Sequence, residues 1–130
     1  MNPEVYSFTL RVPDSAIDDQ DHVNNLKYLE WCLEAAGRHW QARATSQMQH
    51  NYLWYVLHHS IDYKAAAFKG DELTINTWVS SSEGVKSERH YQIVRSSDQR
   101  ELVKAKTIWC LLNGQSHKPT RITDEIRNLF

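Results

Sequence analysis

The chain has 130 residues and a formal net charge of −1 at pH 7, which fits a single domain over residues 1–130 with a sizeable core. Hydrophobic residues make up 41% and charged residues 24%, a balance typical of globular proteins. A nucleic-acid-binding protein would need a basic excess, which is missing. Because the sequence has no signal-peptide pattern and no apolar run near the ~20 residues of a membrane span, we expect a cytoplasmic protein without membrane or nucleic-acid partners.

Aromatic residues and cysteines add two expectations. Five Trp and six Tyr need a large apolar surface, either in a core or at a subunit interface. Cys32 and Cys110 lie in apolar segments and lack the spacing of a metal-ligand or redox motif. We therefore expect two buried free thiols in a reducing compartment rather than a disulfide.

Two periodicities organise the first third of the chain. Residues 5–12 alternate between two side-chain faces, which predicts a strand that ends at Pro13. The period then becomes three to four, which predicts one amphipathic helix from about Asn24 to Ser46 with Asn24 or Asn25 as its N-cap. Gly37 in its interior predicts a close packing contact. The apolar stripe of this helix consists of Leu26, Leu29, Leu33, Ala36 and Trp40.

Strand-like segments follow the helix, separated by short polar turns. They cover residues 52–65, 72–80, 85–95 and 101–113. This spacing is typical of an antiparallel meander, and residues 123–130 are expected to form a short helix. The order predicts an α+β fold in which the long helix packs on one face of a five-stranded antiparallel sheet. Aromatic residues on the other face, such as Trp78, predict a second layer from another subunit, and hence a homodimer or homotetramer.

The densest group of polar side chains lies where the loop meets the long helix, at Asp18–Leu29. A helix start offers unpaired N–H groups and the positive end of the helix dipole, so carboxylates placed there can cap or react. A calcium loop is not indicated, because the sixth position counted from Asp19 is Asn24 rather than glycine. His58 and His59 are neighbours on a predicted strand and point to opposite faces. We expect no metal and no other cofactor.

The motif D-x-x-D-H-V-N-N-x-x-Y over Asp18–Tyr28 resembles the D-x-x-G/Q-H-V-N-N-x-x-Y signature of hotdog-fold acyl thioesterases. It is similar both to the 4-hydroxybenzoyl-CoA thioesterase-like group and to the plant acyl-ACP thioesterases. Segments 61–73 and 119–122 extend the resemblance over nearly all of the chain. The resemblance implies a long central helix wrapped by a five-stranded antiparallel sheet, assembled into dimers or tetramers with active sites between subunits.

The resemblance also implies hydrolysis of an acyl-CoA or acyl-carrier-protein thioester. Asp18 matches the family's catalytic carboxylate, which acts as a nucleophile or as the general base for a water. His22 and Asn24 match the rest of the catalytic block, where His22 orients Asp18 or a water, or holds the loop. Gln20 falls where the plant enzymes have an asparagine that orients the carboxylate.

Other candidates concern substrate binding. Backbone N–H groups near Val23 and Asn25 can polarise the thioester oxygen. Tyr28 can line the acyl site, with core packing as the alternative role. Lys64 and Arg89 are candidate contacts for the phosphates of CoA or a carrier protein, with an ordinary surface charge as the alternative. The substrate-binding set is thus Gln20, Val23, Asn25, Tyr28, Lys64 and Arg89.

Two positions keep rival interpretations open. Asp21 replaces the family's glycine or glutamine, and aspartate adopts a left-handed backbone less readily than glycine does. This departure leaves room for a non-catalytic protein that binds acyl thioesters on the same fold. Glu34 lies on the long helix, where some hotdog thioesterases carry a catalytic glutamate, but its spacing from Arg38 favours a surface ion pair. A hydratase is disfavoured, because no hydratase-type motif is present.

Overall fold

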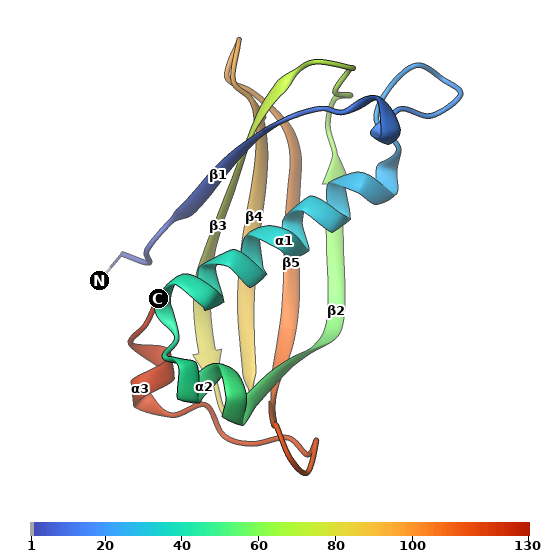
Figure 1. Cartoon of the computed structure of the whole chain (residues 1–130). Coiled ribbons are helices and arrows are strands. Elements are labelled where there is room, and N and C mark those ends of the chain that lie inside the picture. Colours follow the sequence, from blue (N-terminus) through green and yellow to red (C-terminus); the bar gives the residue numbers. More distant parts are fainter. Residues whose placement is uncertain (1) are drawn as a thin grey trace.

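One long helix lies in the hollow of a curved antiparallel sheet in the computed structural model, which describes residues 2–130 (Figure 1). The elements are β1 (Tyr6–Arg11), a 3-10 turn (Asp14–Ala16), α1 (Asn25–Arg43), α2 (Ser46–Asn51), β2 (Tyr52–Tyr63), β3 (Glu72–Glu83), β4 (Lys86–Arg95), β5 (Arg100–Asn113) and α3 (Asp124–Arg127). The strands form one five-stranded sheet in the order β1-β3-β4-β5-β2. All neighbours are antiparallel, which confirms the predicted hotdog architecture. The predicted meander holds only for β3, β4 and β5, because β2 pairs with β5 rather than with β3.

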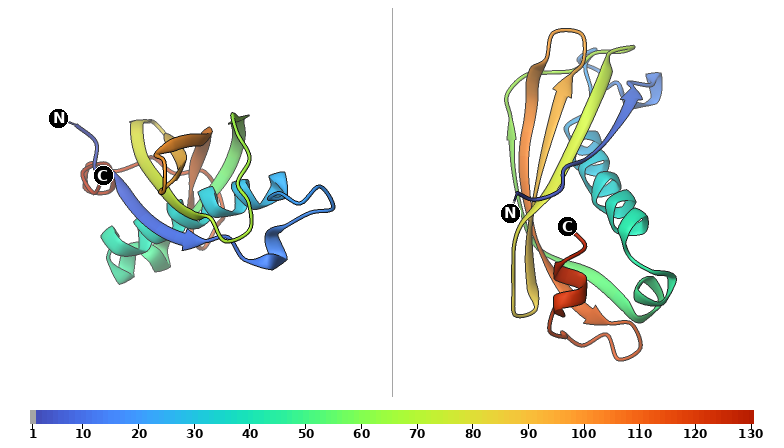
Figure 2. Two further views of the ribbon diagram at one scale, coloured as in Figure 1. Left: turned by 90° about the horizontal axis from the view of Figure 1, so that it is seen from above. Right: turned by 90° about the vertical axis from the view of Figure 1, so that its left-hand side faces the viewer.

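The strand order explains the path of the long helix. β1 and β2 lie at opposite edges of the sheet, although only the helical segment and its flanking loops separate them in the sequence. The chain must therefore cross the whole sheet between these two strands. Helix α1 makes this crossing diagonally on one face, and the sheet curves around it (Figure 2).

The helical segment is divided, whereas the sequence predicted one helix to about Ser46. Helix α1 ends at Arg43, the backbone of Ala44 and Thr45 is extended, and α2 begins at Ser46. The Met48 N–H donates to the Thr45 side-chain oxygen over 3.1 Å. A threonine hydroxyl competes for backbone donors in this way, so it favours a new N-cap over continuation of the helix.

The buried face of α1 also differs from the predicted leucine stripe. Its buried residues are Tyr28, Trp31, Cys32, Ala35, Ala36 and His39. Leu26, in contrast, is 69% exposed. The small side chain of Ala35 lets the helix approach the sheet closely, which leaves the leucine row on the flank of the helix. Gly37 is exposed as well, and no atom lies within 4 Å of where its Cβ would stand, so the predicted close contact at Gly37 is wrong.

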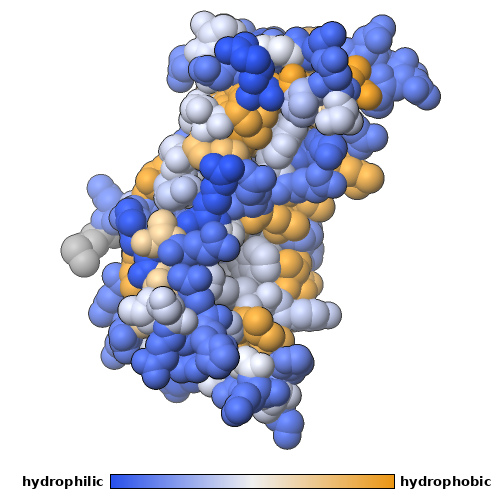
Figure 3. Space-filling model, in the orientation of Figure 1, coloured by the Kyte–Doolittle hydropathy of each residue, from blue (hydrophilic) through white to orange (hydrophobic). Residues whose placement is uncertain are grey.

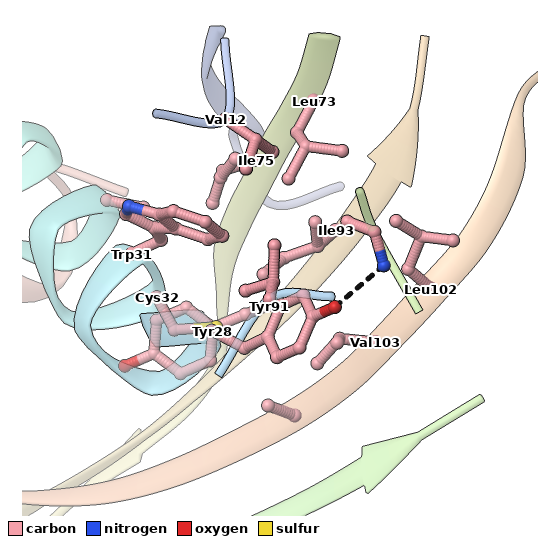
Figure 4. Close-up of a cluster of buried hydrophobic side chains, with 14 of the residues drawn as sticks. Val12, Tyr28, Trp31, Cys32, Leu73, Ile75, Tyr91, Ile93, Leu102 and Val103 are labelled. Carbon is pink, nitrogen blue, oxygen red and sulfur yellow. Dashed lines mark hydrogen bonds between the residues drawn. The ribbon is translucent and has the colours of Figure 1, made fainter. Parts of the chain in front are cut away.

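The main core lies between α1 and the inner face of the sheet (Figure 4). Its centre is formed by side chains with less than 2% exposure from β3, β4 and β5, among them Ile75, Ile93 and Val103. Cys32 packs in this core, and burial raises the pKa of its thiol to about 12. Both cysteines are free and buried, as predicted.

The part of the outer face formed by β1, β3, β4 and the start of β5 is polar. A row of hydrogen bonds crosses it, from Ser7 to Asn76 (2.6 Å), from Asn76 to Gln92 (3.1 Å) and from Gln92 to Glu101 (2.6 Å). Trp78 on this face stacks on a histidine of β4, with ring centroids 5.7 Å apart. These side chains are satisfied by one another and by water, so this part of the outer face gives no support for an apolar second layer.

One buried hydrogen bond ties α1 to the connection between β2 and β3. The Tyr28 hydroxyl accepts from the Ala67 N–H over 2.8 Å (Figure 4). We expect Tyr28→Phe to lower the free energy of unfolding by about 1–3 kcal/mol, because a buried donor is left unpaired. Tyr63→Phe removes a longer bond (3.3 Å) from a half-exposed side chain and serves as the matched control, with an expected loss below about 1 kcal/mol. Urea denaturation of both variants measures the difference, and equal losses would contradict the account.

Candidate active site

The loop that precedes α1 is closed by hydrogen bonds within its own backbone. The Asp18 N–H donates to the carbonyl of His22 (2.9 Å), and the Asp21 N–H donates to the carbonyl of Asp18 (3.1 Å). Ile17 and Val23 pair as an isolated antiparallel bridge below this turn. The loop is thus a small hairpin, and Asp18 and His22 lie opposite each other where its two arms meet.

Asp21 occupies the left-handed region of backbone conformation, with φ at 64°. This is the conformation in which a glycine is favoured and an aspartate is tolerated. The substitution of aspartate for the family's usual residue therefore keeps the shape of the turn. Asp21 itself is exposed.

The Asp18 carboxylate is held by its own turn. Its Oδ1 accepts from the Gln20 N–H over 2.8 Å, which is the geometry of an Asx turn. The Nδ1 atom of His22 lies 3.7 Å from the same oxygen, too far for a direct hydrogen bond. The Asp18 side chain retains 28% exposure, so it is partly shielded from water but reachable by a substrate. Gln20 thus orients Asp18 through its backbone in this structure.

The start of α1 leaves one backbone donor open. The side chain of Asn24 caps the helix by accepting from the Leu26 N–H over 2.8 Å, as predicted. The N–H groups of Val23 and Asn24 are taken by the carbonyls of Ala67 and Ala16. Among residues 2–130, the Asn25 N–H alone of these four consecutive groups has no acceptor. An open N–H at the positive end of a long helix favours a negatively charged oxygen.

Two predicted substrate contacts support the loop from inside the protein. The side chains of Val23 and Tyr28 are 1% and 2% exposed and belong to the core. The Tyr63 hydroxyl donates to the carbonyl of Asn25 (3.3 Å), and its ring lies 5.8 Å from that of Tyr28. Tyr63 and Ala67 lie in the segment 61–73 that extends the family resemblance, but no role was predicted for them, because their contacts depend on where the end of β2 meets α1.

Lys64 and Arg89 have partners outside this loop. Lys64 forms an ion pair with Glu101 of β5. An ordinary surface charge was the alternative role for Arg89, and this alternative is wrong. Arg89 lies on the inner face of β4 and is 5% exposed. The structure therefore brings together Asp18, Gln20, His22, Val23, Asn24 and Asn25 in one loop, with which neither basic side chain forms a hydrogen bond or ion pair. Glu34 pairs with Arg38 over 2.8 Å on the exposed side of α1, as predicted.

A groove of about 370 Å³ opens at the opposite end of α1, between the helix and the sheet. Figure 3 shows apolar surface gathered on this side of the molecule, between α1 and β2. The lining of the groove includes several aromatic rings, namely Trp40, Trp54, Trp109 and Phe130, together with Leu33 and Arg89. Gly37 also lines it, and the missing side chain leaves this part of the groove open.

Two further observations concern metals and membranes. Within residues 2–130, no three His, Cys, Asp or Glu side chains converge in a way that could hold a metal ion. No helix in this part of the chain has the length and apolar character needed to cross a membrane.

The fold is shared with solved structures of thioesterases. A 1,4-dihydroxy-2-naphthoyl-CoA thioesterase from Synechocystis superposes with a TM-score of 0.85 at 18% identity, covering 97% of this chain and 95% of that one. A 12:0-ACP thioesterase from Umbellularia californica superposes with a TM-score of 0.81 at 16% identity, covering 95% of this chain and 48% of that one. These likenesses define the class of the fold, the hotdog fold of thioesterases.

The sequence itself gives the family. The model of the acyl-ACP thioesterase N-terminal domain matches residues 3–130, and the chain belongs to this family. A chloroplastic acyl-[acyl-carrier-protein] hydrolase from Cuphea viscosissima is 25% identical over 85 residues, which are 65% of this chain and 21% of the relative. A chloroplastic palmitoyl-acyl carrier protein thioesterase from Cuphea hookeriana is 24% identical over 86 residues, again 21% of its length. The matched region thus spans about a fifth of the curated relatives.

The left-handed backbone at position 21 leads to a stability prediction. Asp21→Val is expected to lower the free energy of unfolding by about 1–2 kcal/mol, because a β-branched residue is strained there. Asp21→Gly is expected to stay within about 1 kcal/mol of the wild type, since relief of strain and loss of chain entropy oppose each other. Asp19→Val, at an exposed neighbour with negative φ, is the control, and thermal unfolding compares the three. Equal losses for the two valine variants would contradict the assigned conformation.

Proposed function

We propose that this protein hydrolyses an acyl thioester to a carboxylic acid and a thiol, with Asp18 as the reacting carboxylate. The observation that carries the proposal is the presence of two suitable groups in the same short segment. Asp18 is oriented by the Gln20 N–H, and the Asn25 N–H is open at the start of α1. Acyl transfer needs a base or nucleophile and a hydrogen-bond donor that stabilises the developing oxyanion. Membership of the acyl-ACP thioesterase family supports the same chemistry.

Two routes use these groups. In the first, Asp18 accepts a proton from a water, the resulting hydroxide adds to the thioester carbonyl, and the C–S bond breaks as the thiolate leaves and is protonated. In the second, an Asp18 oxygen adds to the carbonyl and expels the thiolate, and water then hydrolyses the mixed anhydride. In both routes the negative charge on the carbonyl oxygen develops at the Asn25 N–H. Other enzymes lose about 2.7–4 kcal/mol of transition-state stabilisation when such a donor is removed.

His22 and Asn24 support Asp18 in this proposal. The imidazole of His22 lies 3.7 Å from the carboxylate, close enough to hold a shared water or to move into contact once a substrate binds. Asn24 acts through the backbone, because its cap fixes the first turn of the helix and with it the direction of the Asn25 N–H. The non-catalytic alternative keeps the same loop as a binding site only.

The proposed substrate is an acyl-CoA or acyl-carrier-protein thioester. Both kinds of carrier occur in the names of similar proteins, a naphthoyl-CoA thioesterase and an acyl-carrier-protein hydrolase. Lys64 follows directly after Tyr63, which contacts the helix start, and it remains the candidate contact for a carrier phosphate. Val23, Asn25 and Tyr28 shape the near end of the acyl site.

We also propose that the active protein is a homo-oligomer assembled through β2. This strand is 12 residues long and pairs on one side only, with β5, so its other edge is free within residues 2–130. Leu53, Tyr55 and Leu57 on this strand are 44%, 59% and 47% exposed. A long apolar edge strand is a template for pairing with another chain, and soluble proteins normally protect such edges. The edge at β1 is shorter, with six residues.

The assignment of Asp18 leads to an activity prediction. We expect Asp18→Asn to lower kcat/KM for acyl-CoA esters by at least about 100-fold, because an amide neither accepts the proton nor attacks the carbonyl. Asp19→Asn, an equal change at an exposed neighbour, should keep near-full activity. The measurement is release of free thiol across a panel of acyl-CoA and acyl-carrier-protein esters.

Three other outcomes have defined meanings. An active Asp18→Asn variant would remove Asp18 from the reaction. A wild type that binds the esters without turnover would establish the non-catalytic alternative. Absorbance changes with enoyl-CoA in place of thiol release would indicate a hydratase.

The edge of β2 leads to a separate prediction. The double variant Tyr55→Lys, Leu57→Lys should shift the protein from an oligomer to a monomer, because like charges would meet across the paired strands. Val5→Lys, at an apolar residue that is 56% exposed beside the opposite edge, is the matched control and should leave the oligomer intact. Analytical ultracentrifugation measures both, and a wild type that sediments as a monomer would overturn the proposal.

A further inference from the structure

Arg89 is a buried cation without a counter-ion. Its side chain projects from the inner face of β4 beneath α1 and is 5% exposed. Within residues 2–130, no carboxylate lies within 4.0 Å of its guanidinium. A buried charge is costly unless it is paired, so such a residue calls for a reason beyond packing.

The neighbours of Arg89 orient it but do not neutralise it. Its Nη1 donates to the Nδ1 of His39 over 2.9 Å and to the Thr77 hydroxyl over 3.1 Å. The Nε2 of His39 in turn lies 2.7 Å from a Glu4 oxygen. This places the proton of His39 on Nε2 and leaves Nδ1 as an acceptor. Burial, together with the Arg89 charge, lowers the pKa of His39, although the hydrogen bond with Glu4 acts in the opposite direction.

Two donor atoms of Arg89, Nε and Nη2, remain for a ligand. No protein acceptor within residues 2–130 contacts its Nε or Nη2. No fully buried side-chain nitrogen or oxygen in this part of the chain is unpaired, so these two atoms must reach an accessible surface. That surface is the groove, which Arg89 lines. Burial lowers the pKa of Arg89 to about 10, so the group is still cationic at neutral pH.

Apolar and aromatic side chains form most of the rest of the groove, which Gln41, Gln49 and Ser87 also line. The rings of Trp40 and Trp54 meet edge to face at 5.7 Å, and Trp109 contributes a further indole from β5. The Phe130 ring lies 5.2 Å from the centre of the guanidinium. The volume of about 370 Å³ is at the lower end of the range of about 300–1,000 Å³ for small-ligand sites.

We infer that this groove binds a free carboxylic acid with an apolar body, whose carboxylate pairs with the Nε and Nη2 of Arg89. An arginine presents two parallel N–H donors that match a carboxylate, and the ligand charge would neutralise the buried cation. The aromatic lining takes the apolar body. The ligand is of the same chemical class as the acid released by thioester hydrolysis, but the inference depends on the groove alone and not on turnover.

Equilibrium binding of octanoate and 1-octanol tests this inference. The two probes share a chain length and differ in the charged head group, and the tryptophans in the groove give a fluorescence signal for both. The wild type is expected to bind octanoate at least about tenfold more tightly than 1-octanol. Arg89→Met should remove this preference while keeping the affinity for 1-octanol. Trp54→Leu, the matched control, should weaken both probes alike and keep the preference.

Each result bears on the inference in one direction. Equal affinity of the wild type for the two probes, or no binding of octanoate, overturns the proposed acid site. This result needs only the wild-type protein. A preference for octanoate that survives in a folded Arg89→Met also overturns it. If Arg89→Met does not fold, Arg89→Lys replaces it and should reduce the preference, because a lysine lacks the paired donors. A wild type that binds octanoate but hydrolyses no thioester supports the acid site and contradicts only the proposed hydrolysis.

Discussion

Ala67 joins the parts of the molecule on which the candidate site depends. Its carbonyl accepts from the Val23 N–H over 3.0 Å, and its N–H donates to the Tyr28 hydroxyl over 2.8 Å. One residue between β2 and β3 thus holds the end of the loop and the first turn of α1 at once. Because the Asp18 turn closes back onto Val23 through the Ile17 bridge, its position follows from the same anchor. A displacement at Ala67 would move both the carboxylate and the open N–H group.

Helix α1 separates two regions of different character. Its first turn carries the polar loop with Asp18 and Asn25, and its second half covers the aromatic groove with Arg89. The helix spans this distance because β1 and β2 are at opposite edges of the sheet. A rise of about 1.5 Å per residue places residues 25 and 39 about 21 Å apart along the axis. The proposed reaction and the proposed acid site therefore lie at opposite ends of one element.

Much of the fold follows from patterns in the sequence. Alternation and turn residues predicted all the strands, and the change of period located the helix and its Asn24 cap. The buried face of the helix was predicted wrongly, because hydrophobicity favours leucines whereas close approach to a curved sheet favours Ala35 and its small neighbours. The break at Thr45 was missed as well, since a hydroxyl cap depends on the local backbone rather than on periodicity.

The candidate site was predictable only in part. The spacing from Asp18 to Asn25 placed these residues in one loop, because local turns bring close neighbours together. Nothing in the sequence showed that Arg89 is buried, since a lone arginine on a strand is usually on the surface. The roles of Tyr63 and Ala67 also depend on contacts between distant segments, which one sequence does not reveal.

The central claim is that the Asn25 N–H and the Asp18 carboxylate flank the thioester carbonyl. Amide NMR tests it most directly, with a ketone analogue of octanoyl-CoA in which a methylene replaces the sulfur and the carbonyl is kept. We predict that the Asn25 amide proton shows the largest change in chemical shift among the amides of the loop and the first turn of α1. An unchanged Asn25 amide in a saturated complex would contradict it.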